Sequence, residues 1–77
     1  MAKKNAPIPN DPISERDVGF TNVAFVDEAG HRIVATVIGF DDGDIRVCNP
    51  HWDNAWHLTQ EQVTRTDEPL NEPPADY

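Results

Sequence analysis

The stretch His31-Arg32-Ile33-Val34-Ala35-Thr36-Val37-Ile38-Gly39-Phe40 decides the fold that the sequence predicts. It is the longest apolar, β-branched run in the chain, and valine and isoleucine favour an extended backbone because their side chains are restricted at χ1. Turn-forming sequences lie on both sides of it, at residues 27–30 and at Asp41-Asp42-Gly43-Asp44. A strand with a hairpin at each end is the middle of an antiparallel meander, so we expect 31–40 to be the central strand.

Shorter runs of the same kind predict the other strands. The expected strands are residues 20–27, 31–40, 45–49, 55–58 and 63–66. Thr59 and Gln62 have the spacing of a capping box, which predicts a single helical turn before the last strand. Gly39 predicts a bulge or a sharp bend in the central strand. Val23 and Phe25 share one face of the first strand and Ala24 and Val26 the other, so apolar residues on both faces suggest a strand that bends around a small barrel.

This order of elements resembles that of the SH3-like and Tudor-like small barrels, in which one helical turn precedes the last strand. The resemblance covers residues 20–66 and depends on element order and turn spacing. It implies a mainly β fold, a five-stranded antiparallel meander or SH3-like barrel with flexible termini. A fold of this kind hosts many unrelated functions, so it says little about activity.

The two ends of the chain differ in composition from the predicted domain at 20–66. Residues 1–19 contain three prolines, Pro7, Pro9 and Pro12, and we expect a flexible arm. Within it, Ser14-Glu15-Arg16-Asp17 has the pattern of a short capped turn. Residues 67–77 are acidic and proline-rich, and we expect a disordered tail.

Length and cysteine content place the chain among small domains without disulfides. The chain has 77 residues and one cysteine, Cys48, which cannot form an internal disulfide. No apolar run approaches the roughly 20 residues that cross a bilayer, and no apolar signal segment follows Lys3 and Lys4. We therefore expect a cytoplasmic protein.

The charge balance points to a protein partner. Six basic and 14 acidic residues give a net charge of −8. This balance disfavours direct contact with nucleic acid or with an anionic membrane, and favours a partner with a basic surface. The candidate partner-binding acids are Asp27, Glu28, Asp41, Asp42, Asp44 and Asp53. The alternative is that the charge serves only solubility.

Trp52 is the candidate apolar contact for that partner. It lies in a loop with Pro50, His51, Asp53 and Asn54, and tryptophan among polar groups is typical of interaction hot spots. The competing interpretation is that Trp52 folds over the open end of the barrel. For Trp56 we expect a place in the core.

Cys48, His51 and His57 are the candidate metal ligands. Zinc sites in proteins use ligands of these types, but generally in closely spaced pairs that this chain lacks. The same residues could form a cysteine–histidine nucleophile pair, which needs a cleft that about 47 folded residues rarely provide. We therefore expect no enzyme activity, no metal and no cofactor.

These observations predict a small acidic, non-enzymatic protein-binding module. One form of it is a phage-type viral inhibitor or adaptor that binds a basic, nucleic-acid-handling host protein. Two alternatives remain, a structural homo-oligomeric subunit and a metal-binding domain that uses cysteine and histidine.

Overall fold

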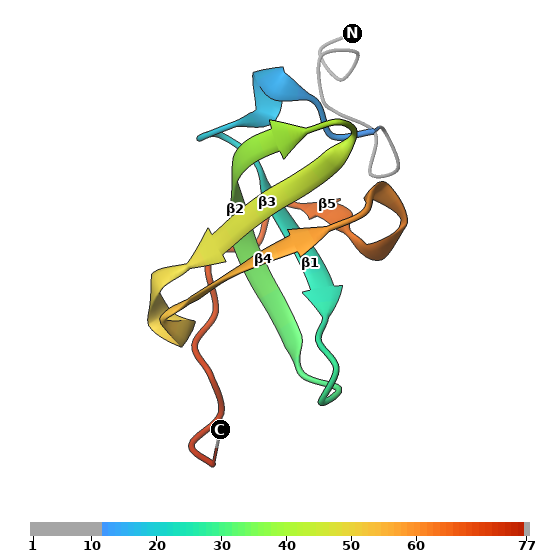
Figure 1. Cartoon of the computed structure of the whole chain (residues 1–77). Coiled ribbons are helices and arrows are strands. Elements are labelled where there is room, and N and C mark those ends of the chain that lie inside the picture. The colour runs from blue at the N-terminus through green and yellow to red at the C-terminus, as the bar shows by residue number, and fades with distance from the viewer. Residues whose placement is uncertain (1–11, 77) are drawn as a thin grey trace, which may run out of the picture.

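Five antiparallel strands in one sheet form the fold, as the sequence predicted (Figure 1). The computed structural model describes residues 12–76. The strands are β1 (Asn22–Val26), β2 (Arg32–Asp41), β3 (Asp44–Asn49), β4 (Asn54–Leu58) and β5 (Thr64–Thr66). Their order across the sheet is β4-β3-β2-β1-β5, with β2 in the centre.

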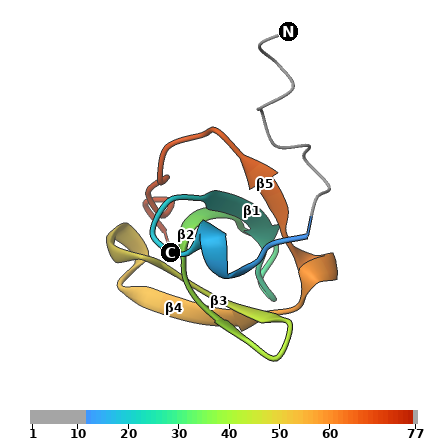
Figure 2. The same ribbon diagram turned by 90° about the horizontal axis from the view of Figure 1, so that it is seen from above.

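The sheet does not close into a barrel, which corrects part of the expectation. Among the described residues, β4 pairs only with β3 and β5 pairs only with β1, so these two strands are the edges. Figure 2 shows that the sheet nevertheless curls, with β3 and β4 lying across from β1 and β5. The chain leaves β4 through a helical turn, and β5 is three residues long, too short to bridge from β1 to β4.

The bulge that Gly39 predicted is present in β2. The register between β2 and β3 shifts between Val37 and Gly39. The extra residue changes which face the following side chains occupy. Phe40 therefore packs against the same core as Val37, whereas strict alternation along the strand would place these two residues on opposite faces.

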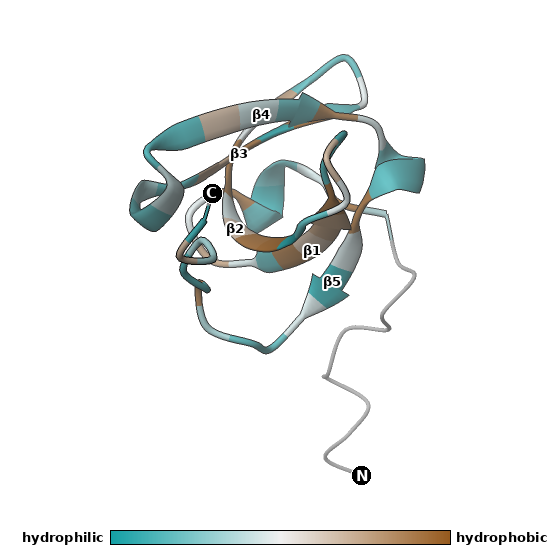
Figure 3. Cartoon of the chain, turned by 90° about the horizontal axis from the view of Figure 1, so that it is seen from below, coloured by the Kyte–Doolittle hydropathy of each residue, from teal (hydrophilic) through white to brown (hydrophobic). Residues whose placement is uncertain are grey.

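The core lies inside the curled sheet, where Figure 3 shows apolar residues along β1, β2 and β3. Its buried members are Ile13, Val23, Phe25, Ile33, Ala35, Val37, Ile45, Val47, Trp52 and Leu58. The alternation of these residues along the strands is the pattern that predicted the sheet.

Within residues 12–76, three short 3-10 turns connect the strands and close the ends: η2 (Glu15–Asp17), η3 (Pro50–Trp52) and η4 (Gln60–Gln62). The sequence predicted η2 and η4, and in each the third residue's side chain accepts a hydrogen bond from the backbone N–H before the turn. It placed only a loop at η3, where the Asn49 side chain accepts from the His51 N–H at 2.8 Å. No helical segment in residues 12–76 has the length and apolar character needed to cross a membrane.

The segment before β1 is tied to the sheet from Ile13 onward. Ile13 is buried, and its backbone N–H and C=O both bond to the Gln60 side chain, at 2.9 and 2.7 Å. The Asp17 carboxylate accepts two hydrogen bonds from Arg65, at 2.7 and 3.1 Å. Residues 13 and 17 of the expected flexible arm therefore contact the sheet, and residues 1–11 lie outside the described part.

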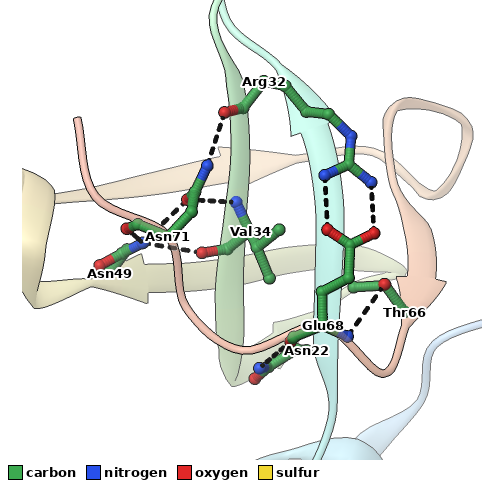
Figure 4. Close-up of polar contacts among 7 residues, drawn as sticks. All are labelled: Asn22, Arg32, Val34, Asn49, Thr66, Glu68 and Asn71. Carbon is green, nitrogen blue, oxygen red and sulfur yellow. Dashed lines mark hydrogen bonds and ion pairs between the residues drawn. The ribbon is translucent and has the colours of Figure 1, made fainter. Parts of the chain in front are cut away.

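The C-terminal segment also docks on the sheet, although its composition predicted disorder from residue 67 to 77. The Asn71 side chain accepts from the Val34 N–H at 2.9 Å and donates to the Arg32 C=O at 2.9 Å (Figure 4). Glu68 pairs with the Arg32 guanidinium at 2.7 and 2.8 Å. In this way the Asn71 amide occupies the position of a neighbouring strand along the part of β2 that extends past β3.

Candidate protein-interaction groove

The six candidate acids do not form one surface. Residues 27 and 28 lie in the β1–β2 loop, residues 41, 42 and 44 lie at the β2–β3 turn, and Asp53 follows η3. The first two sites are at opposite ends of β2, which at about 3.3 Å per residue separates them by up to roughly 30 Å (Figure 1). The six acids are therefore spread over three separate sites and do not form one cluster.

Trp52 is not an exposed contact residue. It is 5% exposed and belongs to the core cluster, and its indole N–H donates to the Asn71 C=O at 3.1 Å. The His31 ring lies 5.8 Å from it, centroid to centroid. The competing interpretation holds, because the indole fills the end of the curled sheet under the C-terminal segment.

The candidate metal ligands stay apart. Cys48 is on β3 opposite Ala55, and His57 is on β4 opposite Arg46. His57 lies 3.6 Å from the Asp44 carboxylate, and His51 is in η3. Residues 12–76 contain no group of three histidine, cysteine or acidic side chains able to hold a metal ion.

The structure does form a hollow that the sequence did not single out, of about 480 Å³ between the β1–β2 loop and β4. We call it the acidic groove. Its apolar lining includes Phe25, Val26, Trp56 and Leu58, and its ionisable lining includes Asp27, Glu28 and His57. No arginine or lysine of the described chain lines it, so its charge is negative.

Two aromatic rings shape the apolar part of the acidic groove. Phe25 and Trp56 meet edge to face, with centroids 5.2 Å apart and planes at 67°. Phe25 is buried, and Trp56 is half-buried, so the expected place of Trp56 in the core is only partly realised. Beside them Val26 is 63% exposed, which is unusual for a strand valine next to a core.

The β1–β2 loop that carries the acidic side of the groove is well ordered by its own hydrogen bonds. The Asp27 carboxylate accepts from the backbone N–H groups of Ala29 and His31, at 3.0 and 2.8 Å. The bond from His31 lowers the pKa of Asp27, so this carboxylate stays ionised at neutral pH. Gly30 completes the loop with a φ of +90°, which glycine adopts without strain. Glu28 lies at the exposed tip, where its charge faces solvent.

A second hollow, of about 570 Å³, adjoins the first on the side of β5. The two share Phe25, Val26 and Gln62. The two arginines that line the second hollow form ion pairs, Arg32 with Glu68 and Arg65 with Asp17. The second hollow lies over β1 and β5, and the acidic groove lies beside β4, so the two meet at the end of β1.

The free edge of β4 forms one wall of the acidic groove. Asn54, Trp56 and Leu58, which alternate along the strand, line the hollow together with His57. An edge strand leaves every second backbone N–H and C=O group without a strand partner, so it can accept an additional extended segment. The arrangement therefore combines backbone hydrogen-bonding capacity, an apolar surface and negative charge.

Sequence reasoning missed Val26 and Trp56 as surface residues. The available signal was an apolar pair, Phe25-Val26, placed directly before two acids. A strand with apolar residues on both faces was interpreted as covered on both sides, but Val26 lies on the outer face at the end of β1, where β5 does not pair with it, and it is exposed. Comparison with protein-family models, with curated proteins and with solved structures found no match to this chain.

Proposed function

We propose that this chain is a small acidic, non-enzymatic protein-binding module whose acidic groove takes an extended segment of a partner protein. The segment carries basic side chains alternating with apolar ones. The observation that supports this most is the composition of the groove, an apolar lining with Val26 exposed and only acidic fixed charge from Asp27 and Glu28.

The geometry of β4 supports an extended conformation for the bound segment. A strand added to the β4 edge places alternate side chains toward the groove, where Trp56 and Leu58 offer apolar contact. A basic side chain at the same site meets the carboxylates of the β1–β2 loop and can lie over the Trp56 ring. The net charge of −8 adds long-range attraction for a basic partner, such as a nucleic-acid-handling protein.

Calorimetric titration with a synthetic peptide of alternating arginine and valine tests the proposal. We expect 1:1 binding that weakens as salt rises, because surface charges are screened beyond about 8–10 Å at physiological ionic strength. The same peptide with glutamate in place of arginine should not bind. Equal binding of the two peptides, or binding unchanged between low and high salt, would remove the electrostatic part of the proposal.

The variant Glu28→Lys tests the position of the site. We expect it to weaken binding of the arginine–valine peptide by roughly three- to ten-fold, since it replaces an attractive exposed charge by a repulsive one. Glu72→Lys makes the same change in net charge at an exposed position outside both hollows. If the two variants bind the peptide equally, net charge rather than the acidic groove carries the interaction.

A further inference from the structure

A second unusual surface lies at the other end of β1. Phe20 is 88% exposed and Ile38 is 43% exposed. The residues on either side of Phe20 bond to the Val37 backbone, Gly19 N–H to its C=O at 2.8 Å and Thr21 C=O to its N–H at 2.9 Å. Phe20 and Ile38 therefore project from neighbouring segments, and both leave apolar area in solvent.

An arginine completes this surface. Arg46 pairs with Gly39 across β2 and β3, and a Cβ atom added at Gly39 would lie 3.5 Å from the Arg46 Cδ. The Arg46 side chain thus crosses the bulge next to Ile38. It is exposed and has no ion pair within residues 12–76, unlike Arg32 and Arg65. We call Phe20, Ile38 and Arg46 the arginine–phenylalanine patch.

The patch and the acidic groove are complementary in chemistry. The patch offers an exposed aromatic ring and a cation, and the groove offers an apolar hollow and two carboxylates. Phe20 and Val26 are separated by about 20 Å along an extended chain, so one molecule cannot bring its own patch to its own groove. A second copy of the chain can.

We propose that the chain associates with itself by docking the arginine–phenylalanine patch of one copy on the acidic groove of another. The Phe20 ring occupies the apolar hollow beside Val26 and Trp56, and the Arg46 guanidinium meets the carboxylates of the β1–β2 loop. The contact is heterologous, because it joins different surfaces on the two copies. This inference depends on the proposed role of the groove as a binding surface, and it adds a specific occupant.

Sedimentation of the full chain over a micromolar-to-millimolar concentration series tests the self-association. The measurement is made at physiological ionic strength, where the repulsion between two chains of charge −8 is screened beyond about 8 Å. We expect the average mass to rise with concentration. We expect Phe20→Asp, which disables the patch, and Val26→Asp, which disables the groove, each to weaken the association about ten-fold or more.

Mixing the two variants is the decisive step. A Phe20→Asp copy retains its groove and a Val26→Asp copy retains its patch, so an equimolar mixture should form a heterodimer although each variant alone stays monomeric. A mixture that remains monomeric while the wild type associates would overturn the proposal, as would a wild type that is monomeric at every concentration. Both side chains are mostly exposed, and circular dichroism checks that each variant is folded.

A charge exchange provides an independent check. Glu28→Lys and Arg46→Glu should each weaken self-association, and the double variant should recover it, since a pair with reversed signs attracts as before. Absence of recovery in a folded double variant would contradict the assigned contact. The arginine–valine peptide is titrated separately into Phe20→Asp. If that variant binds the peptide while the wild type never self-associates, the further inference fails and the proposed function stands.

Discussion

The side chain of Asn71 forms the hydrogen bonds with β2 that a neighbouring strand would form. Its amide oxygen and nitrogen bond to the Val34 N–H and the Arg32 C=O, and its backbone C=O accepts from Asn49 and Trp52. Val34 is fully buried, so removing the amide takes away the hydrogen-bond partner of a backbone N–H at a buried position. A buried donor left without a partner costs about 1–3 kcal/mol.

We therefore expect Asn71→Ala to lower the free energy of unfolding by about 1–3 kcal/mol, measured by urea denaturation. Hydrogen exchange at the Val34 amide should accelerate in the same variant. Glu72→Ala, which removes an exposed neighbouring side chain, is the control and should change stability by less than about 0.5 kcal/mol. Equal stability of Asn71→Ala and the wild type would mean that the C-terminal segment does not contribute to the fold.

The buried carboxylate of Asp17 predicts a pH dependence of stability. Its hydrogen bonds from Arg65, joined by those from the Ser14 N–H and the Thr21 hydroxyl, lower its pKa from 3.8 to about 2. The folded state therefore binds fewer protons than the unfolded state between these values. The resulting stabilisation is complete above about pH 4 and is lost as the pH falls toward 2.

We expect Asp17→Asn to be less stable than the wild type at pH 7 by roughly 2 kcal/mol, from about 1.4 kcal/mol per pKa unit. The difference should shrink as the pH is lowered from 4 to 2, as measured by thermal unfolding across that range. Asp76→Asn, at an exposed position, should follow the wild type throughout. A difference for Asp17→Asn that is constant with pH would indicate lost packing rather than a lost charge interaction.

At the level of elements, the β2–β3 hairpin is fixed by two residues in the left-handed region. Asp42 and Gly43 have φ values of +54° and +87°. Both positive values together are what an Asp-Gly hairpin turn requires. The glycine at the bulge is different, because Gly39 has no positive φ and an added Cβ would make ordinary contact with Arg46.

We expect Gly43→Ala to destabilise the chain by about 1 kcal/mol or more, since alanine is strained at positive φ. Gly39→Ala should be tolerated, with a change below about 0.5 kcal/mol. Chemical denaturation of the two variants side by side makes this comparison. The reverse ranking would show that the bulge, and not the turn, sets the register of β2 and β3.

Local signals explain which elements could be predicted from the sequence. Alternation and turn residues are encoded over a few positions, so the five strands, the Asp42-Gly43 turn and the bulge at Gly39 were predicted correctly. The face that Phe40 occupies could not be predicted, because it depends on how the bulge shifts the register. The contacts of Asn71 could not be predicted either, because they depend on which part of β2 extends past β3. Composition does not indicate the contacts of Glu68 and Asn71, whose side chains in the acidic, proline-rich segment form hydrogen bonds with the sheet.

On the scale of the whole molecule, the candidate site depends on an opening that strand order alone does not reveal. Five strands in this order lead to an expectation of closure around the core face of β1, which carries Val23 and Phe25, whereas Val26 and its cross-strand neighbour Arg32 lie on the opposite, exposed face. The short β5 pairs only with residues 22–24 of β1, and the acidic groove lies beyond it, between the end of β1, the β1–β2 loop and β4. The acids predicted from charge are therefore divided, with Asp27 and Glu28 at the groove and residues 41, 42, 44 and 53 elsewhere.

The central claim is that the acidic groove beside β4 is the binding surface, and amide chemical-shift mapping with the arginine–valine peptide tests it most directly. We expect the largest shifts at Val26, Glu28 and residues 54–58, together with the Trp56 indole N–H, while the buried Trp52 indole changes little. Slower exchange of alternate β4 amides would indicate that the peptide adds as a strand. Shifts centred on Asp41–Asp44, or spread evenly over the acidic surface, would contradict the claim.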